Sequence, residues 1–130
     1  MAINVSQCED GVIYWAAGPE LTVSDLYAAQ AQTCCLLARY PQRRSLLINA
    51  TGVDRYPRAN LVPPFQRLLR DTDLDLLVYV HSRQDSTLIE LVVNLACRLT
   101  PVLSVRQIHF AQTLFEAHCL LRSNSVPTSA

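Results

Sequence analysis

Three aspartates stand at alternate positions in one short polar segment, Asp71, Asp73 and Asp75. Carboxylates gathered in one loop are the ligands of a divalent-cation site. This segment has neither the further oxygen ligands nor the glycine of a calcium loop. Because aspartates are also common in turns, where they bond to nearby backbone groups, we expect a solvated turn and helix terminus between a helix and a strand.

Two histidines and two cysteines in the C-terminal part of the chain could make a zinc site or a nucleophile pair. They are His109, His118, Cys97 and Cys119. Zinc needs three or four such ligands at close approach, and the adjacent His118 and Cys119 diverge if they lie on a helix. A nucleophilic cysteine needs a base that a third group orients, and no residue is identifiable in that role. We therefore expect no metal, no cofactor and no catalytic residue, with all five cysteines as reduced thiols.

The composition excludes several classes of enzyme. The chain has 130 residues, of which three are glycine and none is lysine. Without lysine there is no Schiff-base or pyridoxal-phosphate chemistry and no phosphate-binding lysine of the Walker type. The glycines stand singly at Gly11, Gly18 and Gly52, so they cannot form a glycine-rich phosphate loop. We expect a protein that is not an enzyme.

Charge and hydropathy narrow the choice of partner and compartment. The 11 basic residues balance 11 acidic ones, so nothing favours nucleic acid as a partner. The N-terminus lacks the basic and apolar regions of a signal peptide. The most apolar stretch, Leu88 to Leu103, is interrupted by polar residues and is shorter than the roughly 20 residues of a spanning helix. We expect a cytoplasmic protein without a transmembrane segment.

The hydrophobic periodicity alternates between the strand type and the helix type along the chain. An Asp10-Gly11 turn signal between two short apolar runs predicts an opening hairpin. Strands are expected over 3–7, 12–17, 45–50, 74–80 and 104–110, and helices over 22–40, 64–70, 86–99 and 112–121. This ββαβαβαβα order predicts an α/β fold, with a mostly parallel central sheet, an antiparallel edge from the hairpin and helices as cover. We expect residues 1–122 to form a single domain and residues 123–130 to be a frayed tail.

The expected helix over 86–99 has more apolar surface than its own sheet can cover. Its polar residues Glu90, Asn94 and Arg98 recur every four residues and form one narrow stripe, and most of the others are apolar. A surface helix buries about a third of its circumference. We therefore expect a further cover, which could be a neighbouring helix, another subunit or an apolar ligand. Residues of the adjacent crossover that could share this surface are Leu61, Val62 and Phe65. The candidate interface comprises Leu88, Val92, Leu95 and Leu99, with Glu90, Asn94 and Arg98 at its polar rim.

Two segments and the order of the elements are similar to those of a known superfamily. The segments are Leu46-Leu-Ile-Asn-Ala-Thr-Gly52 and Ile108-His-Phe-Ala-Gln-Thr-Leu-Phe-Glu-Ala117. From about residue 3 to 121 the chain resembles the STAS-like superfamily, the fold of bacterial anti-sigma-factor antagonists and of the cytoplasmic domains of sulfate transporters. In the antagonists, a partner kinase phosphorylates a serine in the loop after the central strand. The corresponding run here, residues 49–60, has no serine, Thr51 comes too early, and Asp54 is followed by Arg55.

The resemblance implies a regulatory domain that works by contact with a protein, and we expect this chain to form a homodimer. A second candidate surface is the loop that holds Thr51, Asp54 and Arg58, because α/β sheets present function at the carboxyl ends of their strands. One alternative is a carrier or sensor of a small apolar or lipid-like ligand, with Arg98 or Arg58 pairing an anionic head group. Another is an enzyme whose site no motif reveals.

Overall fold

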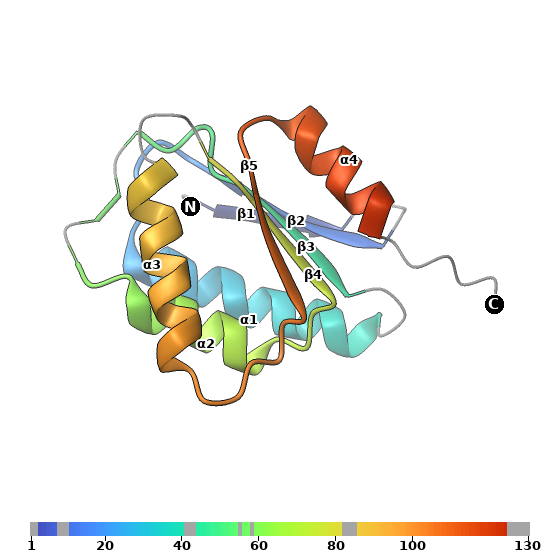
Figure 1. Ribbon diagram of the computed structural model, residues 1–130, viewed down its shortest axis with the longest axis horizontal. Coiled ribbons are helices and arrows are strands. Elements are labelled where there is room, and N and C mark those ends of the chain that lie inside the picture. Colours follow the sequence, from blue (N-terminus) through green and yellow to red (C-terminus); the bar gives the residue numbers. More distant parts are fainter. Residues whose placement is uncertain are drawn as a thin grey trace.

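The computed structural model describes residues 3–7, 11–40, 44–54, 56–57, 59–81 and 86–124, the side chains of 86, 87 and 124 excepted. The elements follow the predicted ββαβαβαβα order (Figure 1). The strands are β1 (Ile3–Gln7), β2 (Val12–Ala17), β3 (Ser45–Asn49), β4 (Leu76–Val80) and β5 (Gln107–Ala111). The helices are α1 (Val23–Arg39), α2 (Val62–Asp71), α3 (Ser86–Leu99) and α4 (Leu114–Asn124).

One five-stranded sheet runs through the molecule in the order β1-β2-β3-β4-β5. β1 pairs antiparallel with β2, and the other three pairs are parallel. The predicted α/β fold with a mostly parallel sheet and an antiparallel edge is therefore confirmed. Gly11 directly precedes β2 and has φ 84°, a left-handed conformation that glycine adopts without steric cost. The rest of the predicted turn, residues 8–10, lies outside the described residues.

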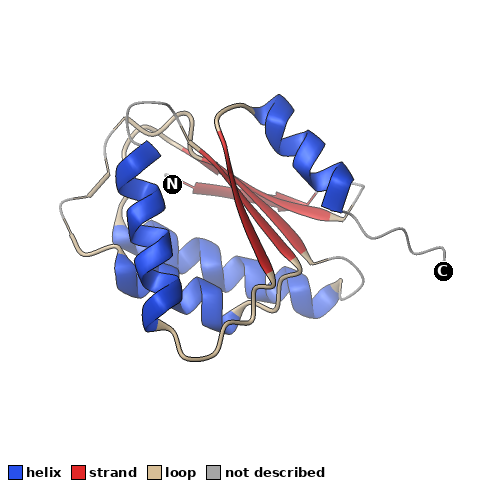
Figure 2. Ribbon diagram, in the orientation of Figure 1, coloured by secondary structure: helices blue, strands red, loops and turns tan. Residues whose placement is uncertain are grey.

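The helices cover the two faces of the sheet unequally. Three of them, α1, α2 and α3, lie on one face, and α4 lies on the other (Figures 1 and 2). The larger core fills the space between the sheet and the three helices, with Trp15 and Tyr79 in one row of the sheet. A smaller cluster, including Leu47, Val78 and Val80, packs under α4. β4 is buried along its whole length, as expected of a strand covered on both faces.

Local sequence signals set the helix starts. Thr22 caps α1: its hydroxyl accepts from the Asp25 amide at 3.1 Å, and the Asp25 carboxylate accepts from the Thr22 amide at 3.2 Å. α2 begins two residues earlier than the predicted 64, because Pro63 and Pro64 lie in the first turn, where no backbone N–H is needed.

The ends of the last helix differ from the prediction. The expected helix over 112–121 is displaced to 114–124, since the hydroxyl of Thr113 accepts from the Glu116 amide at 3.1 Å and caps the helix there. Residues 123 and 124, predicted to belong to the frayed tail, continue α4. Residues 125–130 of that tail lie outside the described residues.

Candidate interaction surface

α3 rests on the molecule by a narrow apolar face. Ile89, Val93 and Ala96 are almost fully buried and belong to the larger core. Their spacing of four and three residues places them on one side of the helix. α3 lies beside α2 rather than directly over the sheet, so much of its circumference is free of internal packing (Figure 1).

Four leucines form a continuous exposed apolar stripe on α3. Leu88, Leu91, Leu95 and Leu99 are 55%, 62%, 47% and 55% exposed. Steps of three, four and four residues keep them on one side of the helix. The apolar surface continues past the end of α3 in Val102, which is 72% exposed, and Leu103. The four leucines of α3, namely Leu88, Leu91, Leu95 and Leu99, are called the leucine stripe below. Exposed apolar clusters of this kind mark sites of association.

The structure places the predicted interface residues in four different environments. Leu88, Leu95 and Leu99 lie on the leucine stripe, whereas Val92 is half-buried and packs against the core. Asn94 and Arg98 are exposed. Glu90 turns toward its own domain, with Oε2 3.7 Å from Nε2 of His81.

Leu91, the most exposed leucine of the stripe, is missing from the predicted interface. It follows Leu88 by three residues and precedes Leu95 by four, a spacing that places it on their side of the helix.

The expected contribution of the crossover residues at the start of α2 to this surface is not found. Leu61, Val62 and Phe65 are 5%, 8% and 2% exposed and belong to the larger core. The physical reason is that α2 has one strongly apolar face, and this face packs against the sheet.

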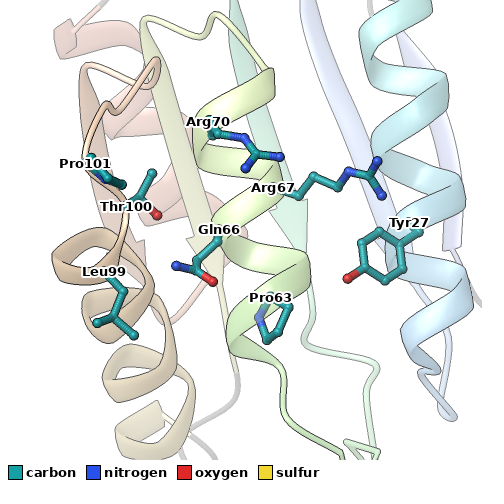
Figure 3. A pocket seen from close by; sticks show the side chains of 8 residues that line it. All are labelled: Tyr27, Pro63, Gln66, Arg67, Arg70, Leu99, Thr100 and Pro101. Atoms are coloured by element: carbon teal, nitrogen blue, oxygen red, sulfur yellow. The ribbon is translucent and has the colours of Figure 1, made fainter.

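The outer face of α2 forms the floor of a groove (Figure 3). α2 lies between α1 and α3, and its side chains Pro63, Gln66, Arg67 and Arg70 share one face at steps of three, one and three residues. Tyr27 of α1 forms one wall. Leu99, Thr100 and Pro101, at the end of α3, form the other. The groove has a volume of about 390 Å³ and is open to solvent.

The two arginines of the groove are held in place by their neighbours. Nε of Arg70 donates to Oδ1 of Asp71 at 2.9 Å, and Nε of Arg67 lies 3.6 Å from Oδ2 of the same carboxylate. The guanidinium carbon of Arg67 also lies 5.5 Å from the centre of the Tyr27 ring, a cation–π geometry. The hydrogen bond from Arg70 is the main reason that the pKa of Asp71 lies below its usual range. One carboxylate therefore pairs with two guanidinium groups, so Arg67, Arg70 and Asp71 together carry a net positive charge.

An aromatic cluster lies at the carboxyl end of β4. His81 directly follows the strand and is 2% exposed. Its ring centre lies 6.3 Å from that of Tyr79 and 6.0 Å from that of Phe110. The hydroxyl groups of Tyr79 and Tyr56 share a hydrogen bond of 2.9 Å. With Glu90 beside it, His81 connects α3 to the end of the sheet.

Sequence reasoning did not single out His81. The sequence feature that could have indicated His81 is its position as a polar residue immediately after the wholly apolar run of β4.

The predicted loop surface of Thr51, Asp54 and Arg58 lies only partly within the residues that the structure describes. Thr51 and Asp54 are exposed, and Arg58 lies outside the described residues. The amide and the hydroxyl of Thr51 both donate to Oδ1 of Asn49, at 3.1 and 2.7 Å. The amide of Asp54 donates to the carbonyl of Pro19 at 3.0 Å. These bonds hold this part of the loop against the end of β3 and the segment that precedes α1.

The aspartates of the polar segment do not converge. Asp71 faces Arg70 and Arg67, Oδ2 of Asp73 lies 3.6 Å from Nη1 of Arg44, and Oδ1 of Asp75 lies 3.7 Å from Nε of Arg106. Each carboxylate thus has an arginine partner of its own, in agreement with the expected solvated turn.

The two histidines considered for a metal site contact different residues, and the two cysteines lie in different environments. Nε2 of His118 lies 3.1 Å from the Tyr14 hydroxyl, and Nε2 of His109 lies 3.4 Å from Oε1 of Gln107. Burial raises the pKa of the Cys97 thiol, and Cys119 is exposed. Within the described part of the chain, no three His, Cys, Asp or Glu side chains are arranged to hold a metal ion.

Comparison with known proteins gives no match to any family model and none to any curated protein. None of the helices in the described ranges has the length and apolar character needed to cross a membrane.

Proposed function

We propose that this chain is a non-enzymatic, STAS-like regulatory domain that acts in the cytoplasm by binding protein and that associates with a second copy of itself. The observation that carries the proposal is the leucine stripe of α3, whose side chains are about half exposed or more. Burying apolar area is the main favourable term in protein association.

A second copy suits the stripe because the stripe is uniform. A two-fold axis that crosses α3 between Leu91 and Leu95 brings Leu88 of one copy toward Leu99 of the other, and Leu91 of each copy toward Leu95 of the other. Such a contact pairs leucine with leucine along its whole length, which is the self-complementarity that a two-fold interface requires. The exposed Asn94 and Arg98 then lie toward the edge, giving the apolar core and polar rim typical of interfaces.

The carrier of a small apolar ligand is the second candidate, and the interior around Trp15 argues against it. The void lined by Ile3, Trp15, Phe65 and Tyr79 has a volume of about 10 Å³. This volume is at the lower limit for a single water molecule, whereas ligand pockets measure about 300–1,000 Å³. A ligand would have to bind elsewhere, and the open groove on α2 has a suitable volume.

Self-association is tested by measuring the mass of the chain over a dilution series, by light scattering after gel filtration or by native mass spectrometry. We expect a species of twice the 14.5 kDa chain mass at micromolar concentration. Leu91→Glu and Leu95→Glu each place a charge in the stripe, and each variant is expected to be a folded monomer.

The matched control is Leu114→Glu, which adds the same charge at a leucine that is 40% exposed on α4. This variant should remain dimeric. A native chain that is monomeric throughout the series overturns the proposal, and so does dissociation by Leu114→Glu to the same extent as by Leu91→Glu.

A further inference from the structure

The groove on α2 presents two cationic side chains that cannot be satisfied by the residues around them. Each guanidinium has five N–H donors, whereas the Asp71 carboxylate has about four acceptor sites. Asp71 therefore cannot accept from all ten donors of Arg67 and Arg70. The side chains of Arg67 and Arg70 are 57% and 59% exposed, so the remaining donors are available on the groove side.

The two arginines are also pre-oriented. Arg67 lies over the Tyr27 ring and against Asp71, and Arg70 binds Asp71 through both Nε and Nη2, at 2.9 and 3.4 Å. Being three residues apart on one helix, they are neighbours about 5–6 Å apart at Cβ. Restricting a side chain before binding lowers the entropy lost when a ligand is bound. The floor of the groove is thus a preformed pair of planar cations that suits carboxylates.

The lining of the groove combines polar and apolar side chains. Pro63, Leu99 and Pro101 are exposed around the arginines (Figure 3). Beyond Leu99 the apolar surface continues into Val102 and Leu103, which are 72% and 42% exposed. A small free anion would bind the arginines and leave this surface uncovered. A peptide that carries carboxylates beside leucine or phenylalanine side chains matches both the charge and the apolar part of the lining.

We propose that this groove is a binding site for an acidic, leucine-containing peptide segment of a partner protein. The carboxylates of the segment pair with Arg67 and Arg70, and its apolar side chains pack against Leu99 and Pro101. The site goes beyond self-association, because it shares only Leu99 with the leucine stripe. It can therefore be examined in a chain that does not dimerise.

The probe is a fluorescein-labelled helical peptide with glutamate and leucine on adjacent faces, and its binding to the whole chain is followed by fluorescence anisotropy. We expect saturable binding that weakens as salt is raised, because salt screens exposed charges. Arg67→Ala and Arg70→Ala should each weaken binding about tenfold, which corresponds to about 1.4 kcal/mol. Tyr27→Leu should weaken it less, because it removes the support of Arg67 and keeps the charge.

Three controls distinguish this site from general electrostatic attraction. Arg106→Ala removes an arginine that is likewise ion-paired and is 79% exposed, but lies outside the groove; binding should be unchanged. A peptide with glutamine in place of glutamate should not bind. Inorganic phosphate should not displace the peptide at equal ionic strength.

Each opposite result overturns the proposal. No binding at low salt, or equal losses in Arg106→Ala and Arg67→Ala, shows that the groove is not the site. Equal binding of the glutamine peptide shows purely apolar docking, and displacement by phosphate shows a site for small anions. Measurement in the Leu91→Glu background separates this inference from the dimer: peptide binding there supports the groove whether or not the native chain dimerises.

Discussion

The hydrogen bond between Trp15 and Thr33 gives a sharp test of how the larger core is held together. Nε1 of Trp15 donates to Oγ1 of Thr33 at 2.7 Å, and that hydroxyl donates in turn to the carbonyl of Ala29 at 2.8 Å. Trp15 is 2% exposed and Thr33 is 0% exposed. Thr33→Val keeps the shape of the side chain and removes the acceptor, so the indole N–H is left buried without a partner.

The cost follows from that orphaned donor. A buried polar group without a hydrogen bond destabilises a protein by about 1–3 kcal/mol. We therefore expect Thr33→Val to lower the free energy of unfolding by that amount, with no change in the dependence on denaturant. Thr33→Ser keeps the acceptor and loses one methyl group, which costs about 0.8 kcal/mol.

A double-mutant cycle identifies the cause. Trp15→Phe removes the donor and leaves a smaller ring, which is costly by itself. In that background no N–H is orphaned, so Thr33→Val should cost less by about 1 kcal/mol or more. Urea unfolding followed by far-ultraviolet circular dichroism measures all four proteins, because Trp15 is the sole tryptophan and fluorescence would be lost in two of them. If Thr33→Val costs the same in both backgrounds, the hydrogen bond does not explain its effect.

Three further predictions concern the core, a surface carboxylate and a thiol. Phe65→Ala should destabilise the chain by about 3–5 kcal/mol in urea unfolding, because the ring is 2% exposed in the core; a loss below 1 kcal/mol contradicts this packing. The pKa of Asp71 is lowered chiefly by the hydrogen bond from Arg70, so its stabilising effect is present above the ordinary value of 3.8 and is lost as the pH falls through the lower folded value. The difference in Tm between the native chain and Asp71→Asn should shrink below pH 3.8, and a constant difference argues against the contact. Iodoacetamide at neutral pH should label the exposed Cys119 faster than Cys97, whose pKa is raised by burial, because the thiolate is the reactive form. Peptide mass mapping gives the two rates, which should become equal in denaturant.

The fold can be predicted from the sequence because the residue patterns that indicate its helices and strands are local. The threonine and aspartate that cap α1 lie three residues apart, so their pairing can be read without knowing any other element. The strand runs are short and rich in apolar residues, and they alternate with segments of helical periodicity. The start of α2 differs from the prediction because prolines break a helix interior but are accepted in the first turn.

The candidate interaction surface is harder to predict from the sequence than the fold, because it depends on how the helices pack together. Leu91 and Val92 are adjacent, and either could accompany Leu88 on one side of α3. The rotation of α3 decides between them, and that rotation is fixed by the burial of Ile89 and Val93 against the rest of the core. The groove requires the relative positions of three helices, which no local pattern contains.

The order of the strands also has a consequence for how the chain folds during synthesis. Each strand pairs with the strand that precedes it in the chain. A chain emerging from the ribosome can therefore add each strand to a sheet edge that is already present, without waiting for a distant segment. The exception is the second face of the sheet, because the helical residues that pack on Leu47 and Val80 belong to α4. That face is completed only when the last 11-residue helix has left the ribosome.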